Sequence, residues 1–271
     1  MHPSTYARVV TIAGSDSGGG AGIQADLKTI AAHGCYGASI ITALTAQNTL
    51  GVTAIHPVPT DFVAAQMDAV FGDIGADAVK IGMLFSPELI HAVAQGLQRH
   101  NVHNIVVDPV MVAQSGDRLV QDEAIAALTA ELIPRAFLIT PNLPEAQVLL
   151  DRAINTRDEI AAAAYDLAAL GAKNVLLKGG HGTGEESEDC LFLGPEQRTV
   201  FLRAPRSATR NNHGTGCTLS SAIAAQLALG KNMEEATQLA KTYITGAIMA
   251  GARHKLGQGH GPVHHFFRFF S

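Results

Sequence analysis

The sequence predicts an α/β protein with a mainly parallel central sheet and helices on both of its faces. Short runs rich in β-branched residues alternate along the chain with segments that carry apolar residues at helical spacing. The strand-like runs are continuously apolar, as expected where both faces of a sheet are covered. Alternation of this kind is typical of a parallel sheet flanked by helices.

Each element is predicted from its own pattern, in chain order. The apolar runs predicted as buried strands are Arg8–Ala13, Ser39–Ala43, Ala78–Ile81, Asn104–Val107, Phe137–Thr140 and Asn174–Lys178. The segments between them with helical spacing are Gly22–Ala32, Asp61–Phe71, Pro87–Gln98, Asp122–Leu132 and Thr156–Leu170.

The last third of the chain departs from this alternation. Region Gly179–Pro205 is rich in turn residues and then contains CLFL and TVFL, which predicts a small hairpin at the sheet edge. Leu219–Leu229 is apolar, free of Gly and Pro, and closed by Gly230, which predicts a buried helix. Met233–Lys255 carries an apolar stripe at helical spacing and is the last predicted helix.

Composition indicates a globular protein with ample material for a core. Hydrophobic residues make up 47% and charged residues 16% of 271 residues. No internal repeat, low-complexity tract or linker divides the chain, so we expect residues 1–271 to form a single domain.

Charge and hydropathy exclude several classes of protein. The formal charge of −5 and the lack of a Lys/Arg cluster argue against a nucleic-acid partner. No run of 18 apolar residues could span a membrane, and the N-terminus lacks the features of a signal peptide. Three scattered cysteines suit neither a disulfide framework nor a zinc site. We therefore expect a cytoplasmic protein.

The stretch His213-Gly-Thr-Gly-Cys217-Thr-Leu-Ser220 is the most informative motif. It leads into the predicted helix that ends at Leu229, so it supplies unpaired backbone N–H groups and the positive end of a helix dipole. Gly214 and Gly216 would let a phosphate approach the backbone. Cys217 falls in the first turn, where the same field favours the thiolate. The motif predicts an anion hole beside an ionisable side chain, a combination suited to phosphoryl transfer.

Polar and glycine-rich segments follow the predicted strands, where ligands bind in sheets of this class. Gly14-Ser-Asp-Ser-Gly-Gly-Gly-Ala-Gly22 follows the first strand and matches neither a P-loop nor a dinucleotide fingerprint. Gln47 follows the second, and its amide could read a base-like ring.

Three later strands end in Asp108, in Thr140-Pro-Asn142-Leu-Pro-Glu145 and in Lys178. Lys178 could meet a phosphate. Asn142 and Glu145 are spaced either as a helix capping box or as a pair that holds Mg²⁺ through water, and both interpretations stay open here.

Eight ordered motifs together resemble the hydroxymethylpyrimidine/phosphomethylpyrimidine kinases of thiamine biosynthesis, which belong to the ribokinase-like superfamily. The resemblance covers nearly the whole chain. The motifs are AGSDSGGGAGIQADLKT (13–29), ITALTAQNT (41–49), KIGML (80–84), DPVM (108–111), TPNLPEA (140–146), LLKGGH (176–181), HGTGCTLS (213–220) and GPVHHF (261–266).

The resemblance implies a role for each matching residue. Cys217 stands where the sugar kinases of the superfamily have the Asp that deprotonates the acceptor hydroxyl, and the loop Gly214, Thr215, Gly216 is the implied anion hole. Gln47 is the implied reader of the aminopyrimidine. The implied pocket lining is Gly14, Ala21, Asp26, Met83 and Val110. The implied nucleotide-binding residues are Asp108, Asn142, Glu145, Lys178 and Thr215, with Asn142 and Glu145 associated with Mg²⁺.

The implied reaction is ATP-dependent phosphorylation of 4-amino-5-hydroxymethyl-2-methylpyrimidine and then of its monophosphate. ATP and Mg²⁺ are the expected cofactors, and we expect a homodimer. Two alternatives remain: a pyridoxal kinase of the same fold, and a non-catalytic pyrimidine-binding protein. Gln114 and Asn212 depart from residues common in the family on the phosphate side of the site.

Overall fold

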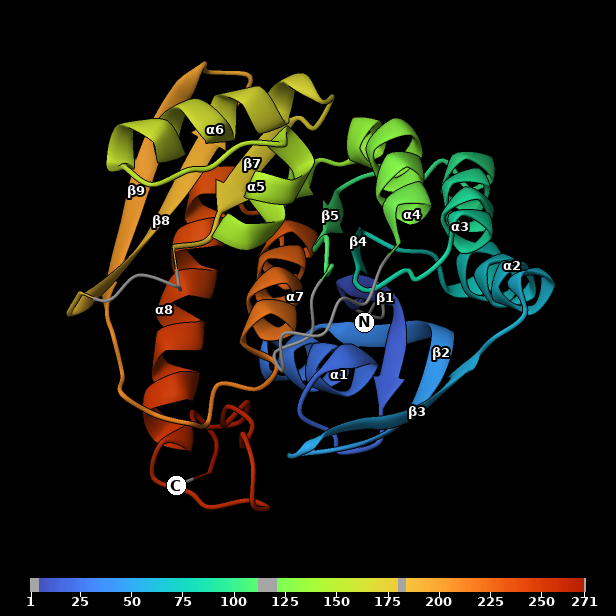
Figure 1. Ribbon diagram of the computed structural model, residues 1–271. Helices are drawn as coiled ribbons and strands as arrows, with labels where there is room; N and C mark the ends of the chain where they lie inside the picture. Colours follow the sequence, from blue (N-terminus) through green and yellow to red (C-terminus); the bar gives the residue numbers. More distant parts are fainter. Residues whose placement is uncertain (1–4, 112–120, 180–183, 271) are drawn as a thin grey trace.

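The computed structural model describes residues 5–111, 121–179 and 184–270, which form one nine-stranded sheet with helices on both faces (Figure 1). The strands are β1 (Arg8–Asp16), β2 (Tyr36–Asn48), β3 (Gly51–Pro57), β4 (Ala78–Ile81), β5 (Ile105–Val107), β6 (Leu138–Ile139), β7 (Asn174–Leu177), β8 (Glu186–Leu193) and β9 (Arg198–Pro205). Their order across the sheet is β3-β2-β1-β4-β5-β6-β7-β8-β9.

The six central strands, from β2 to β7, run parallel, which confirms the predicted mainly parallel sheet. β8 and β9 add an antiparallel hairpin at one edge, as the turn-rich region 179–205 predicts. β3 pairs antiparallel with β2 at the other edge and was not predicted. The prediction missed this ribbon because neither of its faces is covered, so the buried-strand pattern that marks the other strands stops at Ala43.

Two layers of helices cover the sheet (Figure 1). The helices are α1 (Gly22–Ala32), α2 (Thr60–Ala69), α3 (Pro87–Arg99), α4 (Asp122–Ala127), α5 (Leu143–Leu150), α6 (Arg157–Ala169), α7 (Thr215–Ala228) and α8 (Met233–Gly251). α1, α7 and α8 pack on one face around Ile30, Ile223 and Ile244. α2, α3, α4 and α6 pack on the other around Met67, Val93 and Leu132. Within the described residues, no helix combines the length and apolarity needed to cross a bilayer.

Two helix starts matter for the site: that of α7 differs from the sequence prediction, and that of α5 agrees with the predicted capping box. α7 begins at Thr215, four residues before the apolar run, so the GTGC motif forms its first turn. α5 begins directly after Asn142, whose side chain caps it. Both helix starts therefore face the edge of the sheet where the strands end.

Candidate active site

The carboxyl ends of the parallel strands bring the predicted polar residues to one edge of the sheet. Asp108 follows β5, Asn142 follows β6, and Lys178 follows β7. Asn142 and Lys178 form an isolated parallel bridge, which extends β6 and β7 by one step into the site. The predicted convergence of the strand ends is thus confirmed for β5, β6 and β7.

Asp108 lies at the centre of a buried cluster. Its Oδ1 accepts a hydrogen bond from Lys178 Nζ at 2.7 Å and from Thr140 Oγ1 at 3.0 Å. Its Oδ2 lies 3.4 Å from Ser220 Oγ of α7. Burial alone would raise the pKa of Asp108, but the charges of Lys178 and Lys80 outweigh it and hold this pKa below its ordinary value. Asp108 is therefore a fixed anion that holds Lys178 in place.

Asn142 and Glu145 form a complete capping box at the start of α5. The Asn142 N–H donates to Glu145 Oε2 at 2.8 Å, and the Glu145 N–H donates to Asn142 Oδ1 at 2.9 Å. The capping interpretation left open by the sequence is therefore confirmed. Burial, with the nearby Asp108 charge and despite the opposing charge of Lys178, raises the pKa of Glu145 to about 7.

This cluster fits a divalent cation held mainly through water and phosphate. Its carboxylate and amide oxygens are ligands that Mg²⁺ accepts, and the charge of Lys178 does not offset the burial that raises the pKa of Glu145. The described residues contain no group of three or more His, Cys, Asp and Glu side chains arranged to hold a metal by themselves. Mg²⁺ commonly keeps several waters and binds through one or two carboxylates plus substrate phosphates, so the fit is of that kind.

The first turn of α7 lies directly over the Asp108–Lys178 pair. A methyl group built at Gly216 would lie 3.4 Å from Asp108 Oδ2 and 3.5 Å from Lys178 Nζ, so no side chain separates this turn from the pair. Gly214 caps the helix with φ +79°, a conformation that favours glycine. Thr215 is less available than predicted, because its N–H and its hydroxyl both donate to the Asn212 carbonyl, at 3.3 and 2.6 Å.

Cys217 does not have the thiolate character that its place in the helix predicts. Burial raises the pKa of its thiol, and this effect outweighs the opposing charge of Lys80 and a hydrogen bond from the Gly22 N–H. The expectation of a favoured thiolate is therefore wrong, because burial destabilises the thiolate more than the helix N-terminus and the charge of Lys80 stabilise it. Cys217 is a thiol in the resting site.

A fully buried ion pair lies beneath the site. Lys80 Nζ of β4 contacts both oxygens of Asp26, at 2.9 and 2.8 Å. The hydroxyls of Thr11 and Ser221 donate to the same carboxylate, at 2.6 and 2.7 Å. Asp26, predicted to line the substrate pocket, is thus fully buried, with both carboxylate oxygens bonded to protein groups. Lys80 was not among the predicted site residues, although a lysine within the apolar strand AVKI is a signal for a buried partner.

Asp16 organises the glycine-rich loop that follows β1. Its carboxylate accepts from the N–H groups of Gly18, Gly20 and Ala21 at 2.8, 3.0 and 2.8 Å. It also lies 3.0 Å from Nε2 of His213, the residue before the anion-hole glycine. These bonds outweigh the effect of burial and lower the pKa of Asp16. Sequence reasoning missed both Asp16 and His213.

Gln47 reaches the same place from the end of β2. Its Nε2 lies 3.5 Å from His213 Nε2, and its Oε1 lies 3.2 Å from Thr45 Oγ1. The Ser17 hydroxyl bonds both the N–H and the carbonyl of Gln47, each at 2.8 Å, so the loop after β1 clamps the strand end. Gln47 is half-buried.

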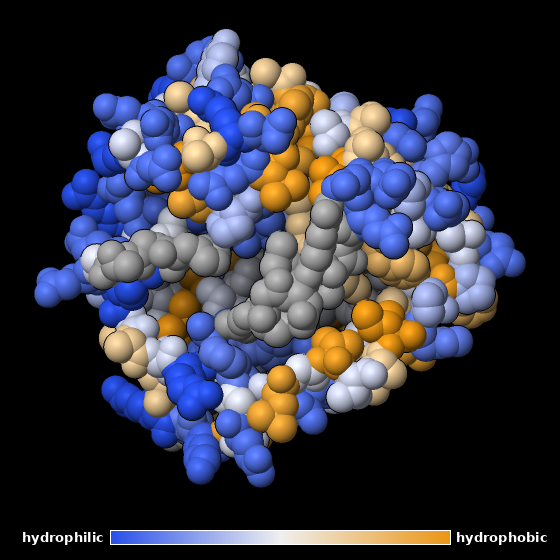
Figure 2. Space-filling view, in the orientation of Figure 1, coloured by the Kyte–Doolittle hydropathy of each residue, from blue (hydrophilic) through white to orange (hydrophobic). Residues whose placement is uncertain are grey.

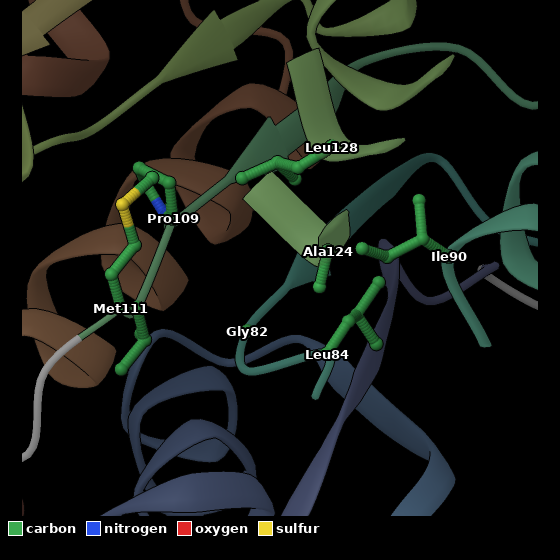
Figure 3. Close-up of a pocket in the computed structure, with 8 residues that line it drawn as sticks. Gly82, Leu84, Ile90, Pro109, Met111, Ala124 and Leu128 are labelled. Carbon is green, nitrogen blue, oxygen red and sulfur yellow. The ribbon is translucent and has the colours of Figure 1, made fainter. Parts of the chain in front are cut away.

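The remaining predicted lining residues lie on neighbouring segments. A methyl group at Gly14 would lie 3.5 Å from Met83 Cε, so these two positions are in contact. Ala21 lies beside Gly214 at the junction of the two glycine-rich loops. Val110 lines a small apolar pocket behind the site, with Gly82, Leu84, Ile90, Pro109, Met111, Ala124 and Leu128 (Figure 3). Gln114 lies outside the described residues.

The C-terminal segment at His260 and Gly261 contacts two parts of the chain near the site. The His213 N–H donates to the Gly261 carbonyl at 3.0 Å, and His260 N–H donates to the Thr49 carbonyl at 2.9 Å. One short segment therefore contacts both the end of β2 and the start of the GTGC motif.

Comparison with known proteins identifies the family. Residues 16–264 match the phosphomethylpyrimidine kinase family. The chain belongs to this family. It is 55% identical over 262 residues to the hydroxymethylpyrimidine/phosphomethylpyrimidine kinase of Rhizobium meliloti, covering 96% of this chain and 97% of that protein. It is 49% identical over 259 residues to the enzyme of the same name from Escherichia coli, covering 95% and 96%.

Solved structures confirm the ribokinase-like fold. The phosphomethylpyrimidine kinase of Clostridium difficile matches with a TM-score of 0.78 and 46% identity, over 89% of this chain and 99% of that one. An ADP complex of Bacillus subtilis pyridoxal kinase matches with a TM-score of 0.90 and 36% identity, over 98% and 100%. The predicted family and fold are both confirmed.

Proposed function

We infer that this chain is an ATP-dependent kinase of thiamine biosynthesis that phosphorylates 4-amino-5-hydroxymethyl-2-methylpyrimidine and then its monophosphate. The observation that carries the inference is the first turn of α7. At Gly216 no side chain separates it from the Asp108–Lys178 pair, and His213, just before the turn, lies 3.5 Å from the Gln47 amide. An anion site and a ring-reading amide thus share one edge of the sheet. The relatives named as kinases of these two pyrimidines support the same substrates.

The chain's own residues suit phosphoryl transfer, which needs positioning and charge stabilisation more than covalent chemistry. The substrate hydroxyl oxygen attacks the γ-phosphorus, the bond to the ADP oxygen breaks, and the hydroxyl proton must leave. We assign the N–H groups of the α7 first turn and the Lys178 ammonium to the phosphate oxygens. Glu145 and Asn142 would hold Mg²⁺, which neutralises phosphate charge when bound.

Cys217 is the ionisable side chain we assign to the hydroxyl proton. Because the pKa of its thiol is raised, Cys217 accepts the hydroxyl proton only when it is itself in the thiolate form, or it releases its own proton as it receives that of the substrate. A role limited to orienting the hydroxyl stays open, and the pH dependence of the rate separates the two.

Pyridoxal kinase is the second candidate function. The structural match to the B. subtilis pyridoxal kinase, at 36% identity, favours keeping it, as does a Staphylococcus aureus pyridoxal kinase solved with pyridoxal, which matches with a TM-score of 0.89. The higher identity to the pyrimidine kinases favours the first candidate. A non-catalytic role is disfavoured because the GTGC turn and the Asn142–Glu145 pair are intact.

A coupled kinase assay tests the assignment. The specificity constant kcat/KM is measured for hydroxymethylpyrimidine, for its monophosphate and for pyridoxal with the same enzyme. We expect both pyrimidines to exceed pyridoxal. The highest kcat/KM for pyridoxal would replace the first candidate with the second.

Three broader expectations stand beside the function: a single working domain over residues 1–271, a cytoplasmic location and a homodimer. For the homodimer, the support is the open edge of the sheet, where Leu44, Leu50 and Ile55 of the β2–β3 ribbon are exposed. Figure 2 shows apolar surface among polar residues on the side of the molecule that carries this ribbon. Light scattering during size-exclusion chromatography would report the mass directly.

A further inference from the structure

We propose that His213, held by Asp16, fixes which way the Gln47 amide faces and thereby selects an amine over an oxygen substituent on the substrate ring. The inference rests on the proposed function, in which Gln47 reads the ring. It concerns a specificity-determining residue that does not itself touch the reacting atoms. The relationship joins residues far apart in the chain: Asp16, Gln47 and His213.

The His213 ring is held on several sides. Its backbone N–H bonds the Gly261 carbonyl, and the segment forms a parallel bridge with Pro262. A methyl group at Gly20 would overlap His213 Cδ2, so the ring packs directly on the Gly20 backbone. The side chain is only 17% exposed. A ring fixed in this way presents Nε2 in one direction.

The proton on His213 Nε2 is dictated by Asp16. The Asp16 carboxylate accepts three backbone N–H bonds and lies 3.0 Å from Nε2, and an ionised carboxylate can only accept. Nε2 must therefore carry a hydrogen and donate it. With that hydrogen given to Asp16, the protonated Nε2 has no lone pair to accept from an amide NH₂. The amide oxygen of Gln47 can share the hydrogen as a second acceptor, whereas its NH₂ can make no bond there.

On the other side of the Gln47 amide, Thr45 requires a hydrogen-bond donor. Its hydroxyl has a single hydrogen, and the Ser15 carbonyl, an acceptor only, lies 2.9 Å from Oγ1. Thr45 Oγ1 therefore faces Gln47 with a lone pair, at 3.2 Å. The group of Gln47 that meets it must be the donor, the amide NH₂.

Both neighbours are satisfied when the amide oxygen faces His213 and the NH₂ faces Thr45. The oxygen and nitrogen of a carboxamide are assigned by the hydrogen bonds around them, and a half-turn of the terminal torsion produces this arrangement. The second lone pair of the oxygen and the second hydrogen of the NH₂ then point toward the ligand. On the His213 side, the ring amine donates a hydrogen bond to the amide oxygen. On the Thr45 side, the amide NH₂ donates to the ring nitrogen.

This arrangement rejects an oxygen at the amine position. A phenolate or carbonyl oxygen placed on the His213 side would meet the amide oxygen, and two acceptors cannot bond. Turning the amide to offer NH₂ there would set its hydrogens against the His213 N–H. Discrimination of this type comes from leaving buried polar atoms unpaired, and it exceeds what a change of size or shape supplies.

Two substitutions at one position test the proposal. His213→Phe keeps a flat ring and removes the donor, whereas His213→Gln places an amide NH₂ within reach of Asp16. We expect His213→Phe to lower the ratio of kcat/KM for hydroxymethylpyrimidine over pyridoxal by about tenfold or more. His213→Gln should keep this ratio within about threefold. A ratio unchanged in His213→Phe would overturn the proposal.

A double-mutant cycle shows whether His213 acts through Gln47. In a Gln47→Leu background, His213→Phe should leave the pyrimidine-to-pyridoxal ratio unchanged, because the amide it orients is gone. A further fall of the ratio in that background contradicts the proposal. A purely structural role would instead change both substrates and the KM for ATP alike.

A ligand-free measurement decides the amide orientation even if the enzyme prefers another substrate. In the wild-type protein, nuclear Overhauser contacts from the Gln47 side-chain NH₂ should be stronger to the Thr45 methyl than to the His213 ring protons. The reverse pattern refutes the orientation whatever the kinetics show. If the wild type phosphorylates no pyrimidine while this pattern holds, the proposed function fails and the geometry stands.

Discussion

Gly214 and Gly20 meet backbone to backbone: a methyl group at Gly214 would overlap the carbonyl oxygen of Gly20. The two glycine-rich loops, which lie near opposite ends of the chain, are therefore in direct contact. One loop carries Asp16 and clamps Gln47, and the other begins the anion hole. The proposed substrate side and the proposed phosphate side of the site are joined at this contact.

Gly214→Ala should therefore damage both stability and turnover. The residue has φ +79°, which costs an alanine about 1 kcal/mol, and the overlap with Gly20 forces the loops apart. We expect kcat/KM to fall at least tenfold, on the order of the rate effect of a misplaced site. Gly230→Ala is the matched control, because Gly230 has φ +82° with no atom within 4 Å of an added methyl. Equal activity losses in the two variants would show that strain alone matters.

Cys217→Ala should lower kcat while the KM for ATP changes little, because the α7 backbone N–H groups remain. A general acid–base group contributes about 10²–10⁴-fold. If the thiolate is the base, the raised pKa of Cys217 makes the wild-type rate climb with pH on the alkaline side. Cys217→Asp should flatten that climb, since a carboxylate is already ionised at neutral pH. A Cys217→Ala enzyme with the wild-type rate would show that the thiol is not the base.

Site residues that follow from local sequence patterns were predicted, and those that depend on contacts between distant parts of the chain were not. Asp108, Asn142, Glu145 and Lys178 follow strands, so strand topology alone brings them to one edge. Asp16 and His213 are 197 positions apart, and neither carries a local signal of the other. The state of Cys217 was predicted wrongly for a related reason: its helix position is visible in the sequence, whereas the burial that raises its pKa comes from the packed site.

Lys80→Met should destabilise the protein severely. The Lys80–Asp26 pair is fully buried, and removing one partner of such a pair typically costs about 3–5 kcal/mol because the other charge is left uncompensated. The double variant Lys80→Met/Asp26→Asn should regain part of that loss, which urea denaturation measures. If the double variant is less stable than the single one, the pair is not the source of the effect.

Glu145→Gln separates the capping role from the metal role. The amide keeps the cap but removes the charge, so the Mg²⁺ concentration for half-maximal rate should rise while the fold survives. Equal loss of stability and activity would leave Glu145 only its capping role.

The stability difference between Glu145→Gln and the wild type should depend on pH. The folded pKa of Glu145, about 7, lies above its ordinary value of 4.5, so the folded state binds more protons than the unfolded chain between these values. The wild type therefore loses stability as pH rises from about 4.5 to 7, and the variant does not. In metal-free buffer at pH 8 we expect the variant to be more stable by about 1–3 kcal/mol, with no difference near pH 4. Urea denaturation at the two pH values measures it, and a variant that is less stable at pH 8 contradicts the raised pKa.

Gln47→Leu tests ring recognition apart from phosphate binding. An aminopyrimidine edge offers a donor beside a ring-nitrogen acceptor, and a glutamine amide can pair with both. Losing this pairing leaves buried polar atoms unsatisfied at about 1–3 kcal/mol each, so the KM for hydroxymethylpyrimidine should rise about tenfold or more. The KM for ATP should not change, because Asp108 and Lys178 lie beside Gly216, whereas Gln47 lies beside His213. Pyridoxal turnover should fall less or improve. If the pyrimidine KM stays at the wild-type value, Gln47 is not the ring reader, and the pyrimidine assignment loses its main residue-level support.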